Sequence, residues 1–146
     1  MPYEQLKLEN QLCFPVYAAS RLITREYQPF LENLGITYPQ YLVLMVLWED
    51  DCLPVNDIAK TLILNTNTIT PLLKRMEQQG LLFRKRSDKD ERKVIVKLTE
   101  KGKDLQKEAV KIPEELIKRL SESELELDDL VKLKESLNSI ISSLSK

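Results

Sequence analysis

Two cysteines, Cys13 and Cys52, carry the most reactive side chains of this 146-residue sequence. A cysteine reacts as its thiolate, whereas the neutral thiol is a poor nucleophile. The sequence has no histidine, which excludes a Ser-His-Asp triad, a histidine general base and a His–Cys zinc finger. Two cysteines are also too few for a structural zinc site or a disulfide framework. A reducing cytoplasm is the expected compartment, and we expect neither a metal nor a cofactor. These counts leave open whether either thiol is reactive or a buried bystander.

Three further observations narrow the class of protein. The sequence has only three glycines and no G-x-G-x-x-G or Walker pattern, so we expect no phosphate-cradling loop. The longest apolar run, residues 41–48, is far too short to span a membrane. The polar residues 1–11 lack the apolar core of a signal peptide, so export is not indicated.

The charge of the sequence is unevenly distributed. The net charge is −1, from 22 basic and 23 acidic residues, and by itself it disfavours binding to nucleic acid. Residues 74–103 nevertheless hold 11 basic and five acidic residues, a net charge of +6, while the segments on either side are acidic. Such a segment is either the electrostatic footprint of a DNA-binding surface or a solvated basic face. The shape of the segment has to decide between the two.

The predicted shape of this segment favours a DNA-binding surface. Helical patterns over residues 54–62 and 65–80 flank a tight turn and predict a helix-turn-helix, with Gly80 ending the second helix. Major-groove reading requires hydrogen-bonding and basic groups on the exposed face of that helix. The residues at its non-core positions are Thr66, Asn67, Thr68, Thr70, Lys74 and Arg75.

A basic hairpin follows the helix-turn-helix. Strand-like runs over residues 81–86 and 93–98 lie on either side of the polar stretch 87–92. A hairpin in this place is a wing, whose cations contact phosphates and whose tip arginine enters a narrow minor groove. The expected phosphate contacts are Lys74, Arg75, Arg84, Lys85 and Arg86, and Lys89 is a further expected DNA contact.

Further helices flank the basic region. One begins near Leu12 or Cys13 and ends at Gly35, and another follows the cap Thr37 with Pro39 at its first position. After the wing comes a helix that Pro113 kinks or divides. The last helix has an apolar stripe made of Leu130, Leu133, Leu137, Ile140, Ile141 and Leu144. The C-terminal helices need a surface to pack against, which either a second copy of the chain or its own first helix provides.

This order of elements resembles the MarR superfamily of bacterial transcriptional regulators. The wing sequence 90–99 is similar to the D-x-R-x(5)-L-T signature of that superfamily. Residues 8–14, 37–41 and 70–80 resemble its organic-hydroperoxide-sensing branch, OhrR. The resemblance covers nearly the whole chain and is weakest after Pro113. It implies a mainly α fold with a small β-wing (α+β), and a homodimer that binds double-stranded DNA at a pseudopalindromic operator. The implied regulator represses transcription until a thiol is oxidised.

The resemblance also implies roles for individual residues. Cys13 matches the reactive cysteine, and Tyr17, Tyr27 and Tyr38 match aromatic residues that support its thiolate. No cysteine follows Cys52, as in the one-cysteine subclass. At the DNA interface, the matching residues are Thr66, Thr68, Thr70 and Pro71 at the start of the recognition helix, and Asp90 and Arg92 at the wing tip. The sequence Asn65-Thr66-Asn67-Thr68 departs from the Asp-Ser-Gly-Thr of that branch, which points to a different operator.

The resemblance divides the chain into three regions. Residues 1–36 form an N-terminal dimerisation and sensor helix, residues 37–100 the winged helix-turn-helix, and residues 101–146 the C-terminal dimerisation helices. Cys13 and Tyr27 are 14 residues apart, which is roughly 21 Å along one helix. A tyrosine that supports the thiolate must therefore come from a partner subunit.

The expected product of oxidation is a sulfenic acid at Cys13, which then forms a mixed disulfide with a small cellular thiol. Cys52 is an alternative resolving thiol, but its neighbours Asp50 and Asp51 oppose a thiolate, so we expect it to be inert. The apolar residues around Cys13 favour an organic hydroperoxide over hydrogen peroxide.

Three other functions stay open. A MarR-type regulator can instead be released from DNA by a small phenolic-like ligand. A thiol peroxidase would share the reactive cysteine, but the chain has no evident resolving cysteine and no thioredoxin-like βαβ pattern, so we do not expect an enzyme. The third of these functions is non-specific architectural binding to DNA.

Overall fold

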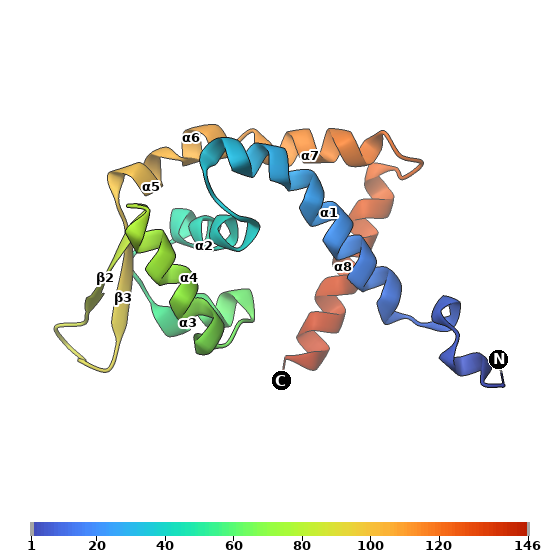
Figure 1. The fold of residues 1–146 in the computed structure, drawn as a ribbon, viewed down its shortest axis with the longest axis horizontal. Coiled ribbons are helices and arrows are strands. Elements are labelled where there is room, and N and C mark those ends of the chain that lie inside the picture. The colour runs from blue at the N-terminus through green and yellow to red at the C-terminus, as the bar shows by residue number, and fades with distance from the viewer. Residues whose placement is uncertain (1, 146) are drawn as a thin grey trace. The chain divides into compact units, whose positions relative to one another are not determined.

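The computed structural model describes residues 2–145 (Figure 1). The chain forms two compact units, of which the first ends at Val110 and the second begins at Lys111. None of the helices in the described part of the chain is long and apolar enough to cross a membrane.

The first unit begins with two short 3₁₀ turns, η1 (Glu4–Leu6) and η2 (Leu8–Asn10), and the long helix α1 (Cys13–Leu34). Helix α1 ends where Gly35 adopts the left-handed backbone conformation, at φ 70°, which costs glycine little because it has no Cβ. The predicted beginning and end of this helix are both confirmed.

A capping residue sets the beginning of the next helix. Helix α2 (Tyr38–Glu49) starts with a reciprocal cap, in which the Gln40 N–H donates to Thr37 Oγ1 at 3.4 Å and the Thr37 N–H donates to Gln40 Oε1 at 3.1 Å. Helices α3 (Val55–Leu62) and α4 (Thr66–Gln78) follow. These two helices form the predicted helix-turn-helix.

The wing is part of a three-stranded antiparallel sheet with the strand order β1-β3-β2. Strands β2 (Leu82–Arg86) and β3 (Val94–Leu98) form the predicted hairpin, with Leu82 opposite Leu98. Strand β1 (Leu53–Pro54) pairs with the other edge of β3 and was not predicted, because two residues are too few to produce an alternating pattern.

The core of the first unit lies between α2, α3, α4 and the sheet, which Figure 1 shows gathered together. Its fully buried side chains come from all of these elements and include Leu44, Leu47, Ile58, Ile69, Leu73, Met76, Leu82 and Val96. This core holds the wing against the helix-turn-helix.

Two short helices, α5 (Glu100–Asp104) and α6 (Gln106–Ala109), end the first unit. Helix α5 lies against the root of the wing. The Thr99 hydroxyl caps it by accepting the Gly102 N–H at 3.1 Å, and the Trp48 indole Nε1–H of α2 donates to the Gly102 carbonyl at 2.9 Å.

The second unit consists of α7 (Ile112–Ser121) and α8 (Leu127–Leu144). Pro113 lies in the first turn of α7, so the helix predicted after the wing is divided there. On α8 the predicted apolar stripe is largely exposed, and only Leu130 and Leu137 are half-buried. Self-association through this stripe stays a prediction, as does the division of the chain into dimerisation and DNA-binding regions.

Candidate functional site

A cluster of three tyrosines lies where α1 meets α2. The Tyr27 ring is 4.9 Å from that of Tyr38 and 5.9 Å from that of Tyr41, measured between ring centroids. Tyr38 and Tyr41 are 6.3 Å apart, and Tyr41 also contacts Trp48 edge-on at 6.3 Å. The structure thus brings Tyr27 and Tyr38 together and adds Tyr41, which the sequence did not single out.

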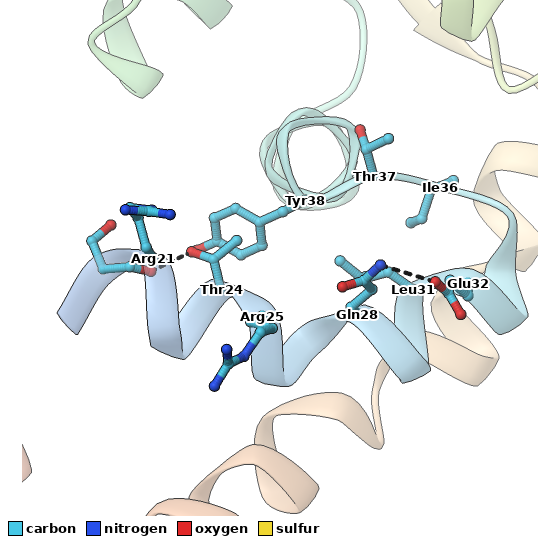
Figure 2. A pocket seen from close by; sticks show the side chains of 10 residues that line it. Arg21, Thr24, Arg25, Gln28, Leu31, Glu32, Ile36, Thr37 and Tyr38 are labelled. Atoms are coloured by element: carbon cyan, nitrogen blue, oxygen red, sulfur yellow. Dashed lines mark hydrogen bonds between the residues drawn. The ribbon is translucent and has the colours of Figure 1, made fainter. Parts of the chain in front are cut away.

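A pocket of about 610 Å³ opens beside this cluster. Figure 2 shows Tyr38 reaching from α2 toward Thr24 and Arg21 on α1, while Gln28 and Glu32 form a hydrogen bond further along α1. The Thr24 hydroxyl donates to the Ser20 carbonyl at 2.7 Å. The pocket therefore has polar walls on α1 and an aromatic wall on α2.

Cys13 lies far from this pocket along the same helix. It is the first residue of α1 and is exposed, and the preceding Leu12 provides no side-chain cap. The free N–H groups of a first helical turn and the helix dipole favour an anion at this position. Because α1 is continuous from Cys13 to Tyr27, the two side chains of one chain cannot meet.

Exposed apolar residues flank Cys13 in the sequence. Leu12, Phe14 and Val16 are all exposed, and so is Tyr17, whose ring lies 5.5 Å below the Arg21 guanidinium carbon. Tyr17 is therefore near Cys13 in sequence but outside the tyrosine cluster. An exposed thiol in an apolar surface is accessible to an apolar oxidant or to a second protein chain.

Burial keeps the tyrosine hydroxyls protonated. Desolvation raises the pKa of Tyr27 to about 12, with smaller contributions from Tyr38 and Tyr41. Burial also raises the pKa values of Tyr38 and Tyr41, in the latter case with a contribution from Tyr38. At neutral pH all three hydroxyls are hydrogen-bond donors, as the support of a thiolate requires.

The Tyr27 pKa predicts a loss of stability at alkaline pH. A tyrosine whose pKa is higher in the folded than in the unfolded protein contributes fully below pH 10, and this contribution is lost as the pH rises toward 12. Tyr27→Phe should reduce the fall in unfolding free energy between these pH values by about 1 kcal/mol, less than two pKa units would give for a fully buried group, because solvent partly screens the half-buried ring. Urea unfolding at each pH measures this fall, and the exposed Tyr3→Phe is the control. An equal fall in wild type and Tyr27→Phe would contradict the prediction.

The recognition helix α4 presents its polar N-terminal end to solvent. Asn65 caps it by accepting the Thr68 N–H at 2.9 Å. The remaining candidates on α4 are either exposed or, in the case of Thr70, half-buried: Thr66, Asn67, Thr68, Thr70, Pro71, Lys74 and Arg75. On the opposite side Ile69, Leu73 and Met76 are buried in the core, so the candidates lie on the free face.

A groove of about 320 Å³ joins this helix to the wing. Thr66 and Thr70 line it from α4, and Arg84 and Arg92 line it from the wing. Three polar residues that were not among the predicted contacts also line it, namely Asn56, Asp57 and Lys93, and the remaining lining is apolar. Asn56 and Asp57 belong to α3. Two polar residues at the start of a helix were the sequence signal that could have identified them as candidate contacts.

The tip of the wing is held in a defined conformation. The Asp90 carboxylate accepts from the Arg92 backbone N–H at 3.1 Å and from Arg92 Nε at 3.2 Å. Both bonds lower the pKa of Asp90, and the bond to the Arg92 side chain contributes the most. The Arg92 side chain is nevertheless 91% exposed, against 31% for Asp90. Asp90 therefore orients an arginine that remains free to enter a DNA groove.

Two other wing arginines differ in their partners. Arg84 is paired with Glu77 of α4, whose carboxylate accepts the Arg84 backbone N–H at 2.8 Å and its Nη2 at 3.2 Å. The backbone bond is the main reason that the pKa of Glu77 is lowered. Arg86 donates to the Glu91 carbonyl across the tip at 2.9 Å. Arg84 fastens the wing to α4, whereas Lys85 and Lys89 are exposed.

Cys52 lies in a tight corner before β1. It is exposed and has a left-handed backbone, at φ 61°. Its N–H donates to Asp51 Oδ1 at 2.8 Å, and the same oxygen accepts the Leu98 N–H of β3 at 3.0 Å. Asp51 thus has a structural task at the end of the sheet. No cluster of three or more metal-ligating side chains occurs among residues 2–145.

Comparison with known proteins identifies relatives along nearly the whole chain. A family model described as transcriptional regulator SarA/Rot matches residues 25–109. The organic hydroperoxide resistance transcriptional regulator of Bacillus subtilis (strain 168) is 48% identical over 142 residues, which are 97% of this chain and 95% of that protein.

Solved structures of AbfR, a protein of Staphylococcus epidermidis, share the fold. Reduced AbfR bound to DNA is 38% identical, with a TM-score of 0.78 and full coverage of both chains. A disulfide-formed AbfR is 41% identical, with a TM-score of 0.63, and covers 94% of this chain and 95% of its own. One relative of this fold has therefore been observed both on DNA and with its thiols oxidised.

Proposed function

Because this chain belongs to the SarA/Rot family of MarR-type transcriptional regulators, we propose that it is a homodimeric DNA-binding regulator, a repressor, which releases its operator when an organic hydroperoxide oxidises Cys13. The observation that carries the proposal is the separation of Cys13 from the tyrosine cluster. A complete thiol site needs both, and only a second copy of the chain can bring them together.

Two surfaces of one unit can bind DNA at once. The free face of α4 carries hydroxyl, amide and basic groups suited to the edges of bases in a major groove. The wing tip presents Arg92 to the adjacent minor groove, and Lys93 and Arg84 line the groove between these elements, where a phosphate backbone passes. A symmetric dimer doubles this arrangement, so the operator is a pseudopalindrome of double-stranded DNA.

The thiol chemistry balances without a metal or a cofactor. The Cys13 thiolate attacks the terminal oxygen of the hydroperoxide, the O–O bond breaks, and an alkoxide leaves and is protonated to an alcohol. The sulfur becomes a sulfenic acid, which condenses with a small thiol to give a mixed disulfide and water. Tyr27 and Tyr38 of the partner subunit donate hydrogen bonds to the thiolate and so support its reactive form. A reducing cytoplasm keeps Cys13 ready for this reaction and restores it afterwards.

Titration of duplex DNA tests the whole proposal. A duplex selected by the reduced protein from random-sequence DNA serves as the operator in a mobility-shift assay. Treatment with cumene hydroperoxide and a small thiol should release the DNA, and a reductant should restore binding. Mass spectrometry of the oxidised protein, before the reductant is added, should find the thiol adduct on Cys13. Persistent binding by fully oxidised protein would contradict the proposal.

Arg92→Ala should weaken operator binding by about 1–3 kcal/mol, or roughly 5–150-fold, because the wing tip loses its minor-groove contact. Fluorescence anisotropy at several salt concentrations measures the effect. The exposed Lys107→Ala, which lies outside the DNA-binding surfaces, provides a control of equal charge change. Equal affinities for the two variants would exclude the wing tip from the interface.

A second candidate function rests on the pocket in Figure 2. Its polar and aromatic walls suit a small phenolic-like ligand, and a ligand between α1 and α2 would also act on the tyrosine cluster. Release of DNA by salicylate under anaerobic conditions, in the absence of any oxidant, would favour this reading. Release that requires a hydroperoxide would favour the thiol mechanism.

A further inference from the structure

Gln79 lies where four helices of the first unit meet. It directly follows α4, and its side-chain Nε2 donates to the Gly35 carbonyl at the end of α1, at 3.1 Å. Its Oε1 accepts from Gln40 Nε2 of α2 at 2.8 Å. Its backbone carbonyl accepts from Lys101 Nζ of α5 at 2.9 Å. A single residue therefore ties the end of the recognition helix to the corner between α1 and α2.

Gln40 is rigidly built into that corner. Its side chain is only 4% exposed, and its Oε1 takes part in the reciprocal cap with Thr37. Since both ends of the Gln40 amide are bonded, it cannot rotate without leaving a buried polar group unpaired. Tyr38 lies in the same helical turn, about 3 Å away along the axis. A displacement of Tyr38 thus carries Gln40 with it.

A second series of contacts runs from the tyrosines to the root of the wing. Tyr41 packs against Trp48, whose indole N–H donates to the Gly102 carbonyl. The Gly102 N–H in turn donates to the Thr99 hydroxyl, which donates to the Gly80 carbonyl at 2.6 Å. Both routes therefore arrive at residues 79 and 80, where the recognition helix ends and the wing begins.

We propose that Gln79 is a positioning residue that couples the tyrosine cluster to the placement of α4 on DNA. With the Gln79 bonds intact, α4 and the wing are held in the binding arrangement. Packed helices move as rigid bodies, so a shift of Tyr38 moves Gln40 and, through Gln79, the end of α4. The part played by Cys13 oxidation rests on the proposed function. The hydrogen bonds by which Gln79 places α4 are observed independently of that proposal.

The test compares two neighbouring glutamines. Gln79→Met keeps the length of the side chain and removes both amide bonds. Gln78→Met is the matched control, because Gln78 is the last residue of α4, is exposed like Gln79, and its side chain makes no hydrogen bond within residues 2–145. Fluorescence anisotropy measures the dissociation constant of the selected duplex before and after treatment with cumene hydroperoxide and a small thiol. The quantity compared is the ratio of the oxidised to the reduced constant.

Gln79→Met should lower this ratio by about tenfold or more, because the reduced form loses affinity while the oxidised form does not. Gln40→Met should give the same loss, and the double variant should lose little more than either. Gln78→Met should keep the wild-type ratio. These results together support the coupling.

Several outcomes would contradict the proposed coupling through Gln79. If Gln79 has only a structural role, the variant loses stability or affinity equally in both redox states, and the ratio stays unchanged. Equal falls in Gln78→Met and Gln79→Met, or additive losses in the double variant, also contradict the coupling. If oxidised wild type keeps its DNA, the proposed function fails, and the coupling fails with it. A wild-type response with an unchanged ratio in Gln79→Met defeats the coupling alone.

Discussion

Cys13→Ser should abolish the release of DNA by organic hydroperoxide and leave the affinity of the reduced protein within about twofold of wild type. Serine has nearly the same size but is not oxidised by a hydroperoxide. Cys13 is exposed at the start of α1 and takes no part in the core, so its replacement leaves the helix-turn-helix intact. Wild type should lose affinity roughly 10–100-fold under the same treatment, as is typical of coupled sites. A mobility-shift titration with and without cumene hydroperoxide measures both effects.

Cys52→Ser is the matched control for this prediction. It removes the other exposed thiol and should respond to the oxidant like wild type. If Cys13→Ser still released DNA on oxidation, Cys13 would not be the sensor. If both serine variants had lost the response, Cys52 would be the resolving thiol, and the mixed disulfide with a small thiol would be wrong.

Gly102→Ala should cost roughly 3 kcal/mol or more of unfolding free energy, at or above the upper end of the range for overpacking. A Cβ at this position would lie 2.1 Å from the Leu81 carbonyl oxygen, far inside the closest distance that a non-bonded carbon and oxygen tolerate. The clash is with backbone, which cannot rotate away as a side chain can. The same carbonyl accepts the Thr99 N–H at 3.1 Å, so any relief must separate α5 from the root of the wing.

Urea unfolding at a fixed protein concentration measures this cost. The exposed Lys103→Ala, one residue further along α5, should change stability by no more than about 0.5 kcal/mol. Gly102→Ala should also weaken DNA binding, since it displaces the wing relative to α4. A stability loss equal to that of Lys103→Ala would show that α5 can move away from Leu81 without cost.

Most of the helices and the wing were predictable, because their signals are local. Thr37 and Asn65 cap the helices that follow them, and Gly35 ends α1 in the left-handed conformation that favours glycine. Strand β1 was not predictable, since a two-residue strand exists only through its pairing with β3. The same reason hid the role of Asp51, whose carboxylate accepts the N–H of Leu98, 47 residues away.

The candidate site was predictable in composition but not in arrangement. The basic segment, the exposed polar residues of α4 and the position of Cys13 at the start of a helix follow from residue types and spacing, whereas the proposed reactivity of Cys13 comes from the resemblance. The pairing of Arg84 with Glu77 could not be predicted, because charge alone makes every cation of the wing equally free to contact a phosphate. Nor does the sequence reveal that Tyr41 and Trp48 extend the tyrosine cluster toward the wing.

The sequence by itself determined the local features of this protein: a thiol chemistry without histidine, a basic wing in an acidic chain, and the ends of the helices. A helical period, a cap and a charge count depend on residues close together in the chain, so they can be read before folding. The tertiary structure decided which groups meet. Gln40 and Gln79, or Trp48 and Gly102, are joined only because the packing of the core brings their helices together. The separation of Cys13 from Tyr27 is fixed by the rigidity of one continuous helix, and this is why the proposed thiol site requires a second copy of the chain.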